Sequence, residues 1–417
     1  MKKSVFLFSI LCFFLNGNAQ ELHLEKCLEE VSKNYPLLKQ KEIEIEINNI
    51  NNDLIQQDWN PKISINGQAT YQSDVTSISA PGINSPELSK DQYKAYLDVS
   101  QTIYDGGLNR IRKDIQNLNY QINTLKIEIQ LRDILLQTQK YFFNALLMQE
   151  NINALEISND EINKRIKILE SGVKNGSVKQ SQVDILKVEL IKTDQKIIEL
   201  RTGKKAYLKI IALFSKLEIS ENEKLVKPSP YLETSENFNK RPEILSLDFQ
   251  SKALDKDIEM SNSKLLPKAS LFGQGGYGRP ALNMLNNSFD AYYIVGARIN
   301  WDINSFFNSK KEKKLTLKFK DNISIQKEVI ETTLNSQLFN LNESLNKLNS
   351  LIEKDKQIID LRAKISKVSA SELDNGIITA TNYLIEKNAE TLAIQTLKSH
   401  EVELLSIQYE IKNLYGN

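Results

Sequence analysis

The sequence is poor in the residues that build turns, disulfides and nucleic-acid surfaces. Its 417 residues include only 15 glycines and nine prolines, well below the usual shares of about 7% and 5%. Because loops and hairpins use both residues, the chain is predicted to be mostly long helix. Two cysteines exclude a disulfide scaffold or a structural zinc site. A formal net charge of +1 excludes a globally basic nucleic-acid binder.

Residues arranged for catalysis or metal binding are also absent. The two histidines, His23 and His400, belong to separate segments, and Cys27 lies in an apolar helical series where packing is expected rather than reactivity. The glycine-rich stretch 273–276 lacks the Lys-Ser or Lys-Thr that completes a phosphate-binding loop. We therefore expect no enzyme activity and no catalytic, cofactor or metal site, so that any energy the function needs comes from a partner.

A long apolar run occurs only at the N-terminus. Lys2 and Lys3 precede an apolar run over residues 5–15, and Gly17-Asn18-Ala19 offers a small-x-small cleavage site. Residues 1–19 are therefore predicted to be a signal peptide that is cleaved after Ala19. No later segment reaches the run of about 18 apolar residues that marks a membrane-spanning helix. The exported chain would lie in the periplasm, outside the cell, or in an outer membrane crossed by strands.

The chain contains two similar halves. Residues 61–71 match residues 267–277, Tyr104-Asp105 aligns with Trp301-Asp302, and Asn175-Gly176 aligns with Asn375-Gly376. Three anchors in the same order make chance similarity the less favoured explanation. We expect a first repeat over residues 20–213, a connecting segment over 214–239 and a second repeat over 240–417.

Each repeat is predicted to follow the same plan. The first has lead-in helices over 22–58, strands over 61–72 and 93–105, and a helical hairpin over 108–213 with its tip near 172–181. The second has a lead-in helix over 242–265, strands over 267–277 and 291–303, and a hairpin over 308–415 with its tip near 373–382.

The four predicted strands are amphipathic. Apolar and polar residues alternate along each with a period of 2, although Gln101 and Phe272 fall on the wrong faces. Strands of about 9–11 tilted residues suit a membrane-spanning barrel. Aromatic residues near the strand ends are typical of the two girdles of such a barrel, with Tyr71, Tyr93, Tyr277, Tyr292 and Tyr293 at one end and Trp59, Tyr104 and Trp301 at the other. A half-buried soluble sheet shows the same alternation, but the export signal and the girdles favour the membrane.

Four strands are too few to close a barrel, because the smallest closed barrels have about eight. An open sheet edge is not tolerated in lipid, where unpaired backbone groups find no water. If the strands span a membrane, several chains must share one barrel: two chains would supply eight strands and three chains twelve.

The predicted hairpins are long coiled coils. Apolar residues from Leu108 to Ile129 alternate in steps of three and four, and no proline interrupts residues 108–171. At 1.5 Å per residue this helix would extend roughly 95 Å. Gly172, Asn175 and Gly176 predict the first turn, and Asn375 and Gly376 the second. A soluble coiled-coil rod would have the same helices, but it does not explain why each hairpin begins directly after an amphipathic strand pair.

A run of lysines follows the fourth strand and comprises Lys310, Lys311, Lys313, Lys314, Lys318 and Lys320. A solvated helix face is the simplest interpretation. The alternative hypothesis is that the run lies at the periplasmic surface of the membrane and contacts anionic head groups.

Three short segments carry a resemblance through their order in the chain: residues 24–38, the junction Asp105-Gly106-Gly107, and residues 241–244 at the start of the second repeat. In these segments the chain resembles the TolC family of outer-membrane efflux channels. The resemblance implies a homotrimer whose hairpin tips dock onto a periplasmic adaptor (membrane fusion) protein and an inner-membrane pump. Family members often narrow the tunnel with acidic residues shortly after the turn glycine. The candidates for this aperture are Gln182, Asp184, Asn382 and Glu386. Gln182 and Asn382 align with the family's carboxylates, so either the aperture is less acidic here or Asp184 and Glu386 take the role. The alternative for all four residues is a solvated helix face.

We therefore expect a mixed, mainly α fold: a trimeric, twelve-stranded transmembrane β-barrel with four strands per chain, continuous with a long α-helical coiled-coil barrel. The expected function is the outer-membrane exit duct of a tripartite efflux pump or type I secretion system. It would conduct substrate passively across the periplasm and the outer membrane, in contact with outer-membrane lipid and without nucleic acid. The alternative is a periplasmic coiled-coil adaptor or structural protein without a pore.

Overall fold

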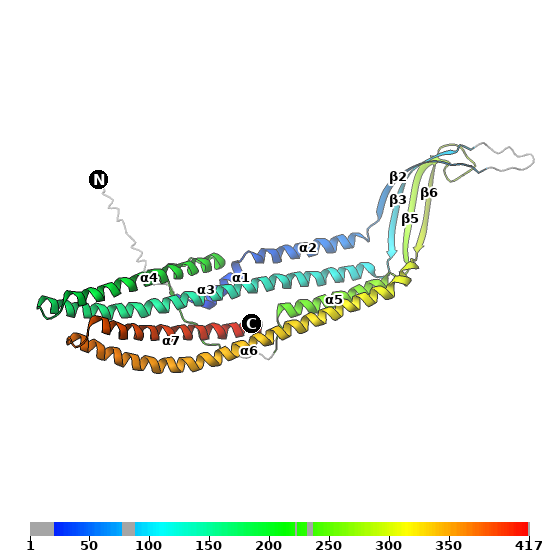
Figure 1. The fold of residues 1–417 in the computed structure, drawn as a ribbon. Helices are drawn as coiled ribbons and strands as arrows, with labels where there is room; N and C mark the ends of the chain where they lie inside the picture. Colours follow the sequence, from blue (N-terminus) through cyan, green and yellow to red (C-terminus); the bar gives the residue numbers. More distant parts are fainter. Residues whose placement is uncertain (1–20, 77–87, 222, 232–236, 416–417) are drawn as a thin grey trace, which may run out of the picture. The chain divides into compact units, whose positions relative to one another are not determined.

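The computed structural model describes residues 21–76, 88–221, 223–231 and 237–415. The predicted signal peptide, residues 1–19, lies outside them. The first half of the chain contains helices α1 (Leu24–Asn34) and α2 (Leu37–Gln57), strands β2 (Lys62–Tyr71) and β3 (Asp91–Tyr104), and helices α3 (Leu108–Lys174) and α4 (Gln180–Ser215) (Figure 1). The second half contains helix α5 (Pro242–Ser263), strands β5 (Lys268–Arg279) and β6 (Asp290–Asn300), and helices α6 (Asn304–Asp374) and α7 (Ala380–Leu414).

The order of helix, two strands, long helix and shorter helix thus occurs twice, and the fold is mainly α as expected. The lead-in over 22–58 is divided into α1 and α2 because Tyr35, which precedes Pro36, is extended with ψ 139°. A residue before proline is disfavoured in the helical conformation. The connecting segment over 214–239 contains a two-residue strand, β4 (Lys224–Leu225), that the sequence did not predict.

Two compact units are built from both halves of the chain. The helical unit contains Met1–Leu38, Ile129–Arg241 and Thr332–Asn417, and the sheet unit contains Lys39–Glu128 and Pro242–Glu331. Helices α3 and α6 contribute residues to both units. The predicted repeats are therefore units of sequence, whereas each packed unit joins equivalent segments of the two halves.

The sheet unit holds one antiparallel four-stranded sheet in the order β2-β3-β5-β6. Its register places Ile65 opposite Leu97, Leu97 opposite Gly275, and Gly275 opposite Tyr293. An aspartate leads each second strand into its long helix. Asp105 accepts hydrogen bonds from the backbone N–H groups of Gly107 (2.8 Å) and Asn109 (2.7 Å), and Asp302 accepts one from Asn304 (3.0 Å). These bonds satisfy N–H groups that a helix start leaves unpaired.

None of the helices in the described part of the chain is both long enough and apolar enough to cross a lipid bilayer. Instead, the apolar residues of the long helices follow the predicted seam. Leu108, Ile111, Ile122 and Leu125 on α3 are buried.

The core of the helical unit surrounds helix α1. Leu24 and Cys27 are fully buried against Phe142, Leu146 and the helices α4 and α7. Burial raises the pKa of the Cys27 thiol to about 12, so this cysteine packs as a small apolar residue, as its apolar series predicts.

Gln149 of α3 holds the connecting segment in place. Its side-chain amide donates to the carbonyl oxygen of Leu225 and accepts from the N–H of Leu225, both at 2.9 Å. The other edge of β4 pairs in parallel with strand β1 (Glu21–Leu22). Lys204 donates to Gln149 Oε1 (2.9 Å) and to the carbonyl of Glu223 (2.8 Å). The Gln149 side chain thus makes, on one edge of β4, the pair of hydrogen bonds that the backbone of a third strand would make. Burial lowers the pKa of the neighbouring Lys204.

We expect Gln149→Leu to destabilise the helical unit. The substitution leaves the buried N–H and C=O of Leu225 without partners, which costs roughly 1–3 kcal/mol for each group left unpaired. Limited proteolysis of residues 216–231 and the melting temperature of the purified protein measure the loss. Asn153→Leu, which replaces an exposed amide one turn along the same helix, is the matched control. Equal melting temperatures and cleavage rates for the two variants would contradict the role assigned to Gln149.

Candidate functional site

One face of the four-stranded sheet is apolar and uncovered. The odd-numbered residues of β2 and of β6 point to this apolar sheet face, where Ile65, Tyr293 and Ile299 are 85%, 76% and 75% exposed. A half-buried soluble sheet turns its apolar face towards a core. Here that face is open, so the alternation of the strands does not serve a core within the described chain.

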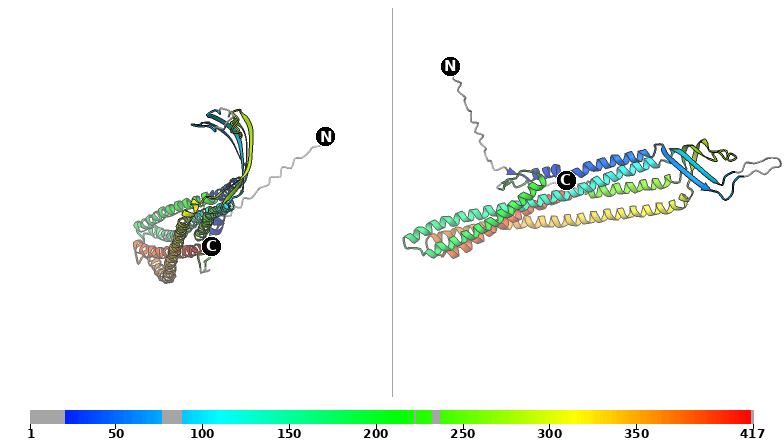
Figure 2. Two further views of the ribbon diagram at one scale, coloured as in Figure 1. Left: turned by 90° about the vertical axis from the view of Figure 1, so that its right-hand side faces the viewer. Right: turned by 90° about the horizontal axis from the view of Figure 1, so that it is seen from above.

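The opposite face is polar and more sheltered. Along β3, Lys94, Tyr96 and Asp98 are half-buried, whereas the alternate residues Tyr93, Ala95 and Leu97 are exposed. Figure 2 shows that the sheet is curved, and side chains on the concave side of a curved sheet are the sheltered ones. Gln274 donates a hydrogen bond to Asp98 (2.5 Å) on this polar sheet face.

The two exceptions to the alternation have structural explanations. Gln101 lies on the apolar sheet face, where its side-chain amide donates to the carbonyl oxygens of Trp59 and Thr102, beside a break in the β3–β5 register. Phe272 lies on the polar sheet face. Its ring covers Gly296, where a Cβ would lie 2.9 Å from the ring, and Arg298 stacks on it at 4.9 Å. Glycine at 296 therefore makes room for the ring.

The aromatic residues predicted to form the girdles lie at the two ends of the sheet, with one correction to the face they occupy. Tyr71, Tyr93, Tyr277 and Tyr293 are exposed on the apolar sheet face near the loop ends of their strands. Tyr292 was assigned to this girdle wrongly: neighbouring residues of a strand point to opposite faces, and Tyr292 packs against the position of Gly276 on the polar sheet face.

At the helix end of the sheet lie Trp59, Tyr104 and Trp301. Tyr104 and Trp301 are exposed, and the indole N–H of Trp301 donates to the carbonyl of Leu265 (2.9 Å). Strands β2 and β6 each have one neighbour in the described chain, so their outer edges are open.

The two hairpin tips end their first helices in the same way. Gly176 and Gly376 adopt φ +73° and +72°. Ser177 N–H donates to Gly172 O (2.9 Å) and Gly176 N–H to Val173 O (3.0 Å). Ile377 and Gly376 make the equivalent bonds to Glu372 and Leu373. This is a Schellman cap, whose left-handed position favours glycine, and it explains why the Asn-Gly pair recurs. Asn175 and Asn375 are the residues just before these glycines.

The four aperture candidates make different contacts. Gln182 Oε1 accepts from the N–H of Ala380 (2.6 Å) and so joins the start of α4 to the start of α7. Glu386 pairs with Arg362 of α6 at 3.0 Å, and Asp184 accepts from Gln180 of its own helix (2.8 Å). Asp184 alone among the four lines a groove of about 570 Å³ between α4 and α7. Asn382 is exposed, and its N–H caps onto Thr379.

Two ion pairs between the hairpins were not predicted from the sequence. Arg165 of α3 pairs with Asp374 of α6, and Lys387 of α7 pairs with Glu161 of α3. The Lys387 side chain is only 3% exposed and also reaches Glu390 (3.0 Å). The available signal was the position of Lys387 in the apolar seam of α7, one turn after Tyr383 and Leu384, where a lysine needs a buried partner.

Tyr383 and Thr391 complete this cross-linked region, which we term the hairpin lock: Glu161, Arg165, Asp374, Tyr383, Lys387 and Thr391. Tyr383 is buried beside Arg165, and burial raises its pKa to about 12. Thr391 donates to Ser158 of α3 at 3.0 Å. The hairpin lock therefore holds α3, α6 and α7 together by ion pairs and hydrogen bonds. Such polar pairs fix which turns of the three helices lie opposite one another, which apolar contacts do less specifically.

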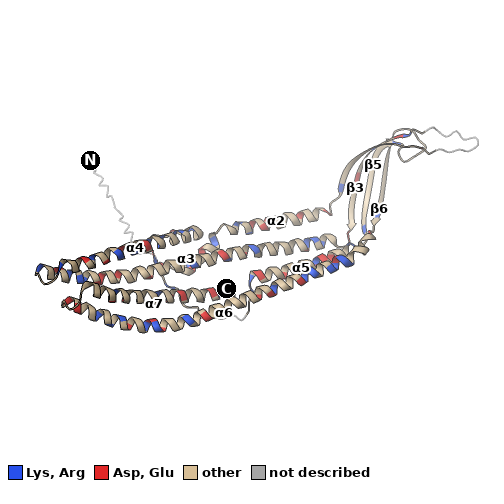
Figure 3. Ribbon diagram, in the orientation of Figure 1, with Lys and Arg blue, Asp and Glu red and all other residues tan. Residues whose placement is uncertain are grey.

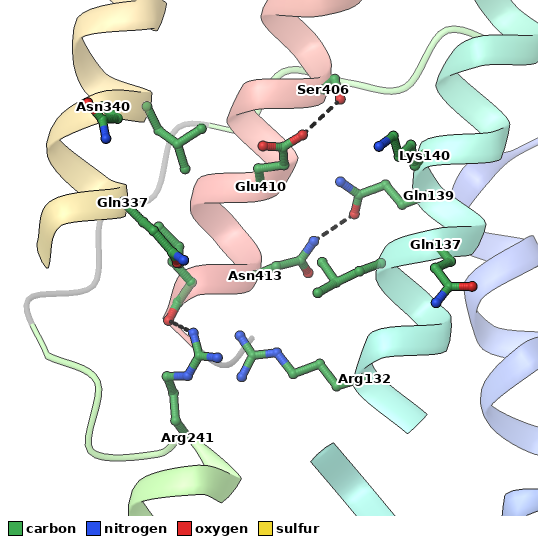
Figure 4. Close-up of a pocket in the computed structure, with 13 residues that line it drawn as sticks. Arg132, Gln137, Gln139, Lys140, Arg241, Gln337, Asn340, Ser406, Glu410 and Asn413 are labelled. Carbon is green, nitrogen blue, oxygen red and sulfur yellow. Dashed lines mark hydrogen bonds between the residues drawn. The ribbon is translucent and has the colours of Figure 1, made fainter. Parts of the chain in front are cut away.

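A cavity of about 600 Å³ lies farther from the tips, between α3, α6 and α7 (Figure 4). Asn413 donates to Gln139 (2.7 Å), and Arg241 donates to the last helical carbonyl of α7, that of Leu414 (3.0 Å). Glu410, whose pKa is raised by burial, also lines it. These bonds join the cavity's own walls. Within the described residues, no group of three His, Cys, Asp or Glu side chains could hold a metal ion.

Comparison with known proteins agrees with this geometry. Residues 27–207 match the family model described as outer membrane efflux protein. A comparison with curated protein sequences gives no match.

Solved structures of outer-membrane proteins share the fold, and three of them come from Vibrio cholerae, Campylobacter jejuni and Neisseria gonorrhoeae. The outer membrane protein VceC from Vibrio cholerae has a TM-score of 0.68 at 13% identity, over 94% of this chain and 96% of its own. The CmeC outer membrane channel of Campylobacter jejuni has 0.68 at 16% identity, over 94% and 85%. The open state of the MtrE outer membrane channel of Neisseria gonorrhoeae has 0.67 at 14% identity, over 94% and 89%. The TolC-family resemblance predicted from the sequence is thus confirmed: the chain carries the outer membrane efflux protein family match over residues 27–207 and has the fold of these channels.

Proposed function

We propose that this chain is one protomer of an outer-membrane exit duct that serves an efflux pump or a type I secretion system. The observation that carries the proposal is the uncovered apolar sheet face, built directly onto two long helices, in a chain with the family match and the channel fold. An apolar face of this kind is stable in lipid and costly in water.

Open edges on β2 and β6 support a shared barrel. In lipid each unpaired backbone group costs several kcal/mol, so the edge of β2 would pair with β6 of a neighbouring copy. Three copies would supply twelve strands, the number that the family resemblance implies. The polar sheet face would then line the pore.

Uncovered apolar residues on α2 also support assembly. Ile43, Ile47, Ile50 and Leu54 are exposed and follow one another in steps of four, three and four, which is the seam of a coiled coil. A seam with no partner in the described part of its own chain is expected to pack against a helix of another copy.

The hairpin tips are the proposed docking site for a periplasmic adaptor, behind which the inner-membrane pump supplies the energy. Gly172, Asn175, Gly176, Asn375 and Gly376 shape the tips. Gln182, Asp184, Asn382 and Glu386 follow them and would narrow the entrance. Opening would require the hairpin lock to loosen when the partner binds. The proposed location is the outer membrane, reached after cleavage of residues 1–19.

The test of the assembly is the native mass of the protein extracted in detergent from the outer-membrane fraction. Three mature chains per particle are expected, because the family resemblance implies twelve strands and each chain supplies four. A monomer, or a protein found only in the soluble periplasm, would contradict the duct and favour the rival, a periplasmic rod without a pore.

Neighbouring residues on opposite faces of β2 test the membrane contact. Ile65→Lys places a charge on the apolar sheet face and should reduce trimer yield in the outer membrane strongly, since a lysine at mid-bilayer costs about 2–4 kcal/mol in a barrel. Asn66→Lys, on the polar sheet face, should leave the yield near that of the parent protein. A soluble sheet would accept Ile65→Lys at least as well, because that position is already 85% exposed.

Arg165→Gln tests the hairpin lock as a barrier to flow. Loss of the Arg165–Asp374 pair should raise the mean conductance of trimers in planar bilayers, because one bond between the two hairpins is gone. The control is Arg201→Gln, which breaks an α3–α4 pair with Glu156 (2.6 Å) inside a single hairpin. Unchanged conductance in Arg165→Gln, or an equal rise in the control, would show that this lock does not limit flow.

A further inference from the structure

The lysine run at the start of α6 separates into two groups. Lys318 pairs with Asp321 (2.7 Å) and Lys320 pairs with Asp255 of α5 (2.6 Å). The other four, which we term the lysine patch, are exposed and make no ion pair with any residue that the structure describes: Lys310, Lys311, Lys313 and Lys314. Figure 3 shows basic residues gathered along this part of α6, next to the strands.

The lysine patch points away from the body of the sheet unit. Glu312, between the lysines, accepts a hydrogen bond from Ser261 of α5 (2.9 Å) and so marks the packed side of the helix. Residues three and four apart share a helix face. Lys310 and Lys314 therefore lie opposite Glu312, on the same face as Phe306 and Phe307, and Lys311 and Lys313 flank that face.

Aromatic side chains border the lysine patch on the side of the sheet. Phe307 is 75% exposed and Trp301 is 55% exposed, and the Trp301 and Phe306 rings meet edge to face at 6.2 Å. Solvent-exposed aromatic rings followed within one or two helical turns by lysines are typical of a bilayer interface, where rings lie at the head groups and ammonium groups reach phosphates.

A purely solvated patch does not account for this arrangement. Lysines at spacings of three and four repel one another by a few tenths of a kcal/mol per pair, and the only acidic residue among them, Glu312, is bonded to α5. The exposed rings of Trp301, Phe306 and Phe307 are not stabilised by contact with water. An external anionic surface offsets both costs.

We propose that the lysine patch binds the head groups of anionic phospholipids at the periplasmic leaflet of the outer membrane, with Trp301, Phe306 and Phe307 at the level of the head groups. This inference rests on the proposed function, which puts the adjoining apolar sheet face in the bilayer. The patch would fix the depth at which the sheet sits and would select the lipids around the base of the barrel.

Trp301 is a built-in reporter for the test. The chain has two tryptophans, and a Trp59→Phe background leaves Trp301 as the single tryptophan next to the patch. The substitution keeps the hydrogen bond that Gln101 donates to residue 59, because the acceptor is the backbone carbonyl. This full-length protein is reconstituted into phosphatidylcholine vesicles that contain a minor share of phosphatidylglycerol. Bromine, which quenches tryptophan, is carried on the acyl chains of one lipid or of the other.

The expected result is a preference for phosphatidylglycerol around Trp301 of about fivefold or more, the amount that one membrane-bound lysine supplies. Replacing the four lysines of the patch by glutamine should reduce the preference to about one while quenching by brominated phosphatidylcholine persists. The matched control replaces four exposed lysines farther along α6 and should keep the preference: Lys347, Lys354, Lys356 and Lys367.

The outcomes separate the two proposals. Equal quenching by both lipids in the parent protein, or a preference that survives in the patch variant, would overturn the lipid site and leave the duct intact. No quenching by either brominated lipid would place Trp301 outside the bilayer and overturn the proposed function together with this inference. Native mass of each variant shows whether the trimer has formed, so that a loss of preference is not an assembly defect.

Discussion

Backbone hydrogen bonding at the outer edges of β2 and β6 is the constraint on which the rest of the structure depends. The four strands satisfy one another internally but leave two edges open, and their apolar face is exposed at the same time. Water would satisfy the edges but not the apolar face, and lipid would satisfy the apolar face but not the edges. Strands of further copies, in lipid, would satisfy both, as the proposed duct requires. The long helices that continue from β3 and β6 would then follow the same symmetry, which would give the uncovered seam on α2 a neighbour.

The helical unit solves a different problem with different chemistry. An entirely apolar seam would let long helices slide past one another, since every turn would offer the same contact. Buried polar groups fix the register: Lys387 against Glu161, Thr391 against Ser158, and Gln149 against the backbone of Leu225. Each gains little net stability, because desolvation offsets the attraction, but each disfavours other registers strongly. The polar contacts near the tips would also suit the opening proposed above, since they can be exchanged for water or for a partner's groups.

The long, periodic elements could be predicted from sequence because period and length are local properties. The alternation of β2, β3, β5 and β6, the seam of α3 and the Asn-Gly tips all follow from neighbours within a few residues. The face of Tyr292 was predictable too, because it is fixed by its position next to Tyr293, and the assignment to the girdle neglected that alternation. In contrast, β4 is two residues long and exists through Gln149, which is far away in sequence. The hairpin lock likewise depends on which turns of α3, α6 and α7 lie level, and this is a property of tertiary packing.

Between Trp301 and Lys314 the exposed side chains change in order from apolar to aromatic to positively charged. The apolar sheet face ends at Ile299 and Trp301, exposed phenylalanines follow, and unpaired lysines come next. Each step lies within one or two helical turns, close to the few ångströms over which a bilayer changes from hydrocarbon to head group to water. A soluble helix has no reason to order its residues by depth, whereas a helix that leaves a membrane must. In the proposed duct, the same ordering would make the position of the sheet along the membrane normal a property of this chain.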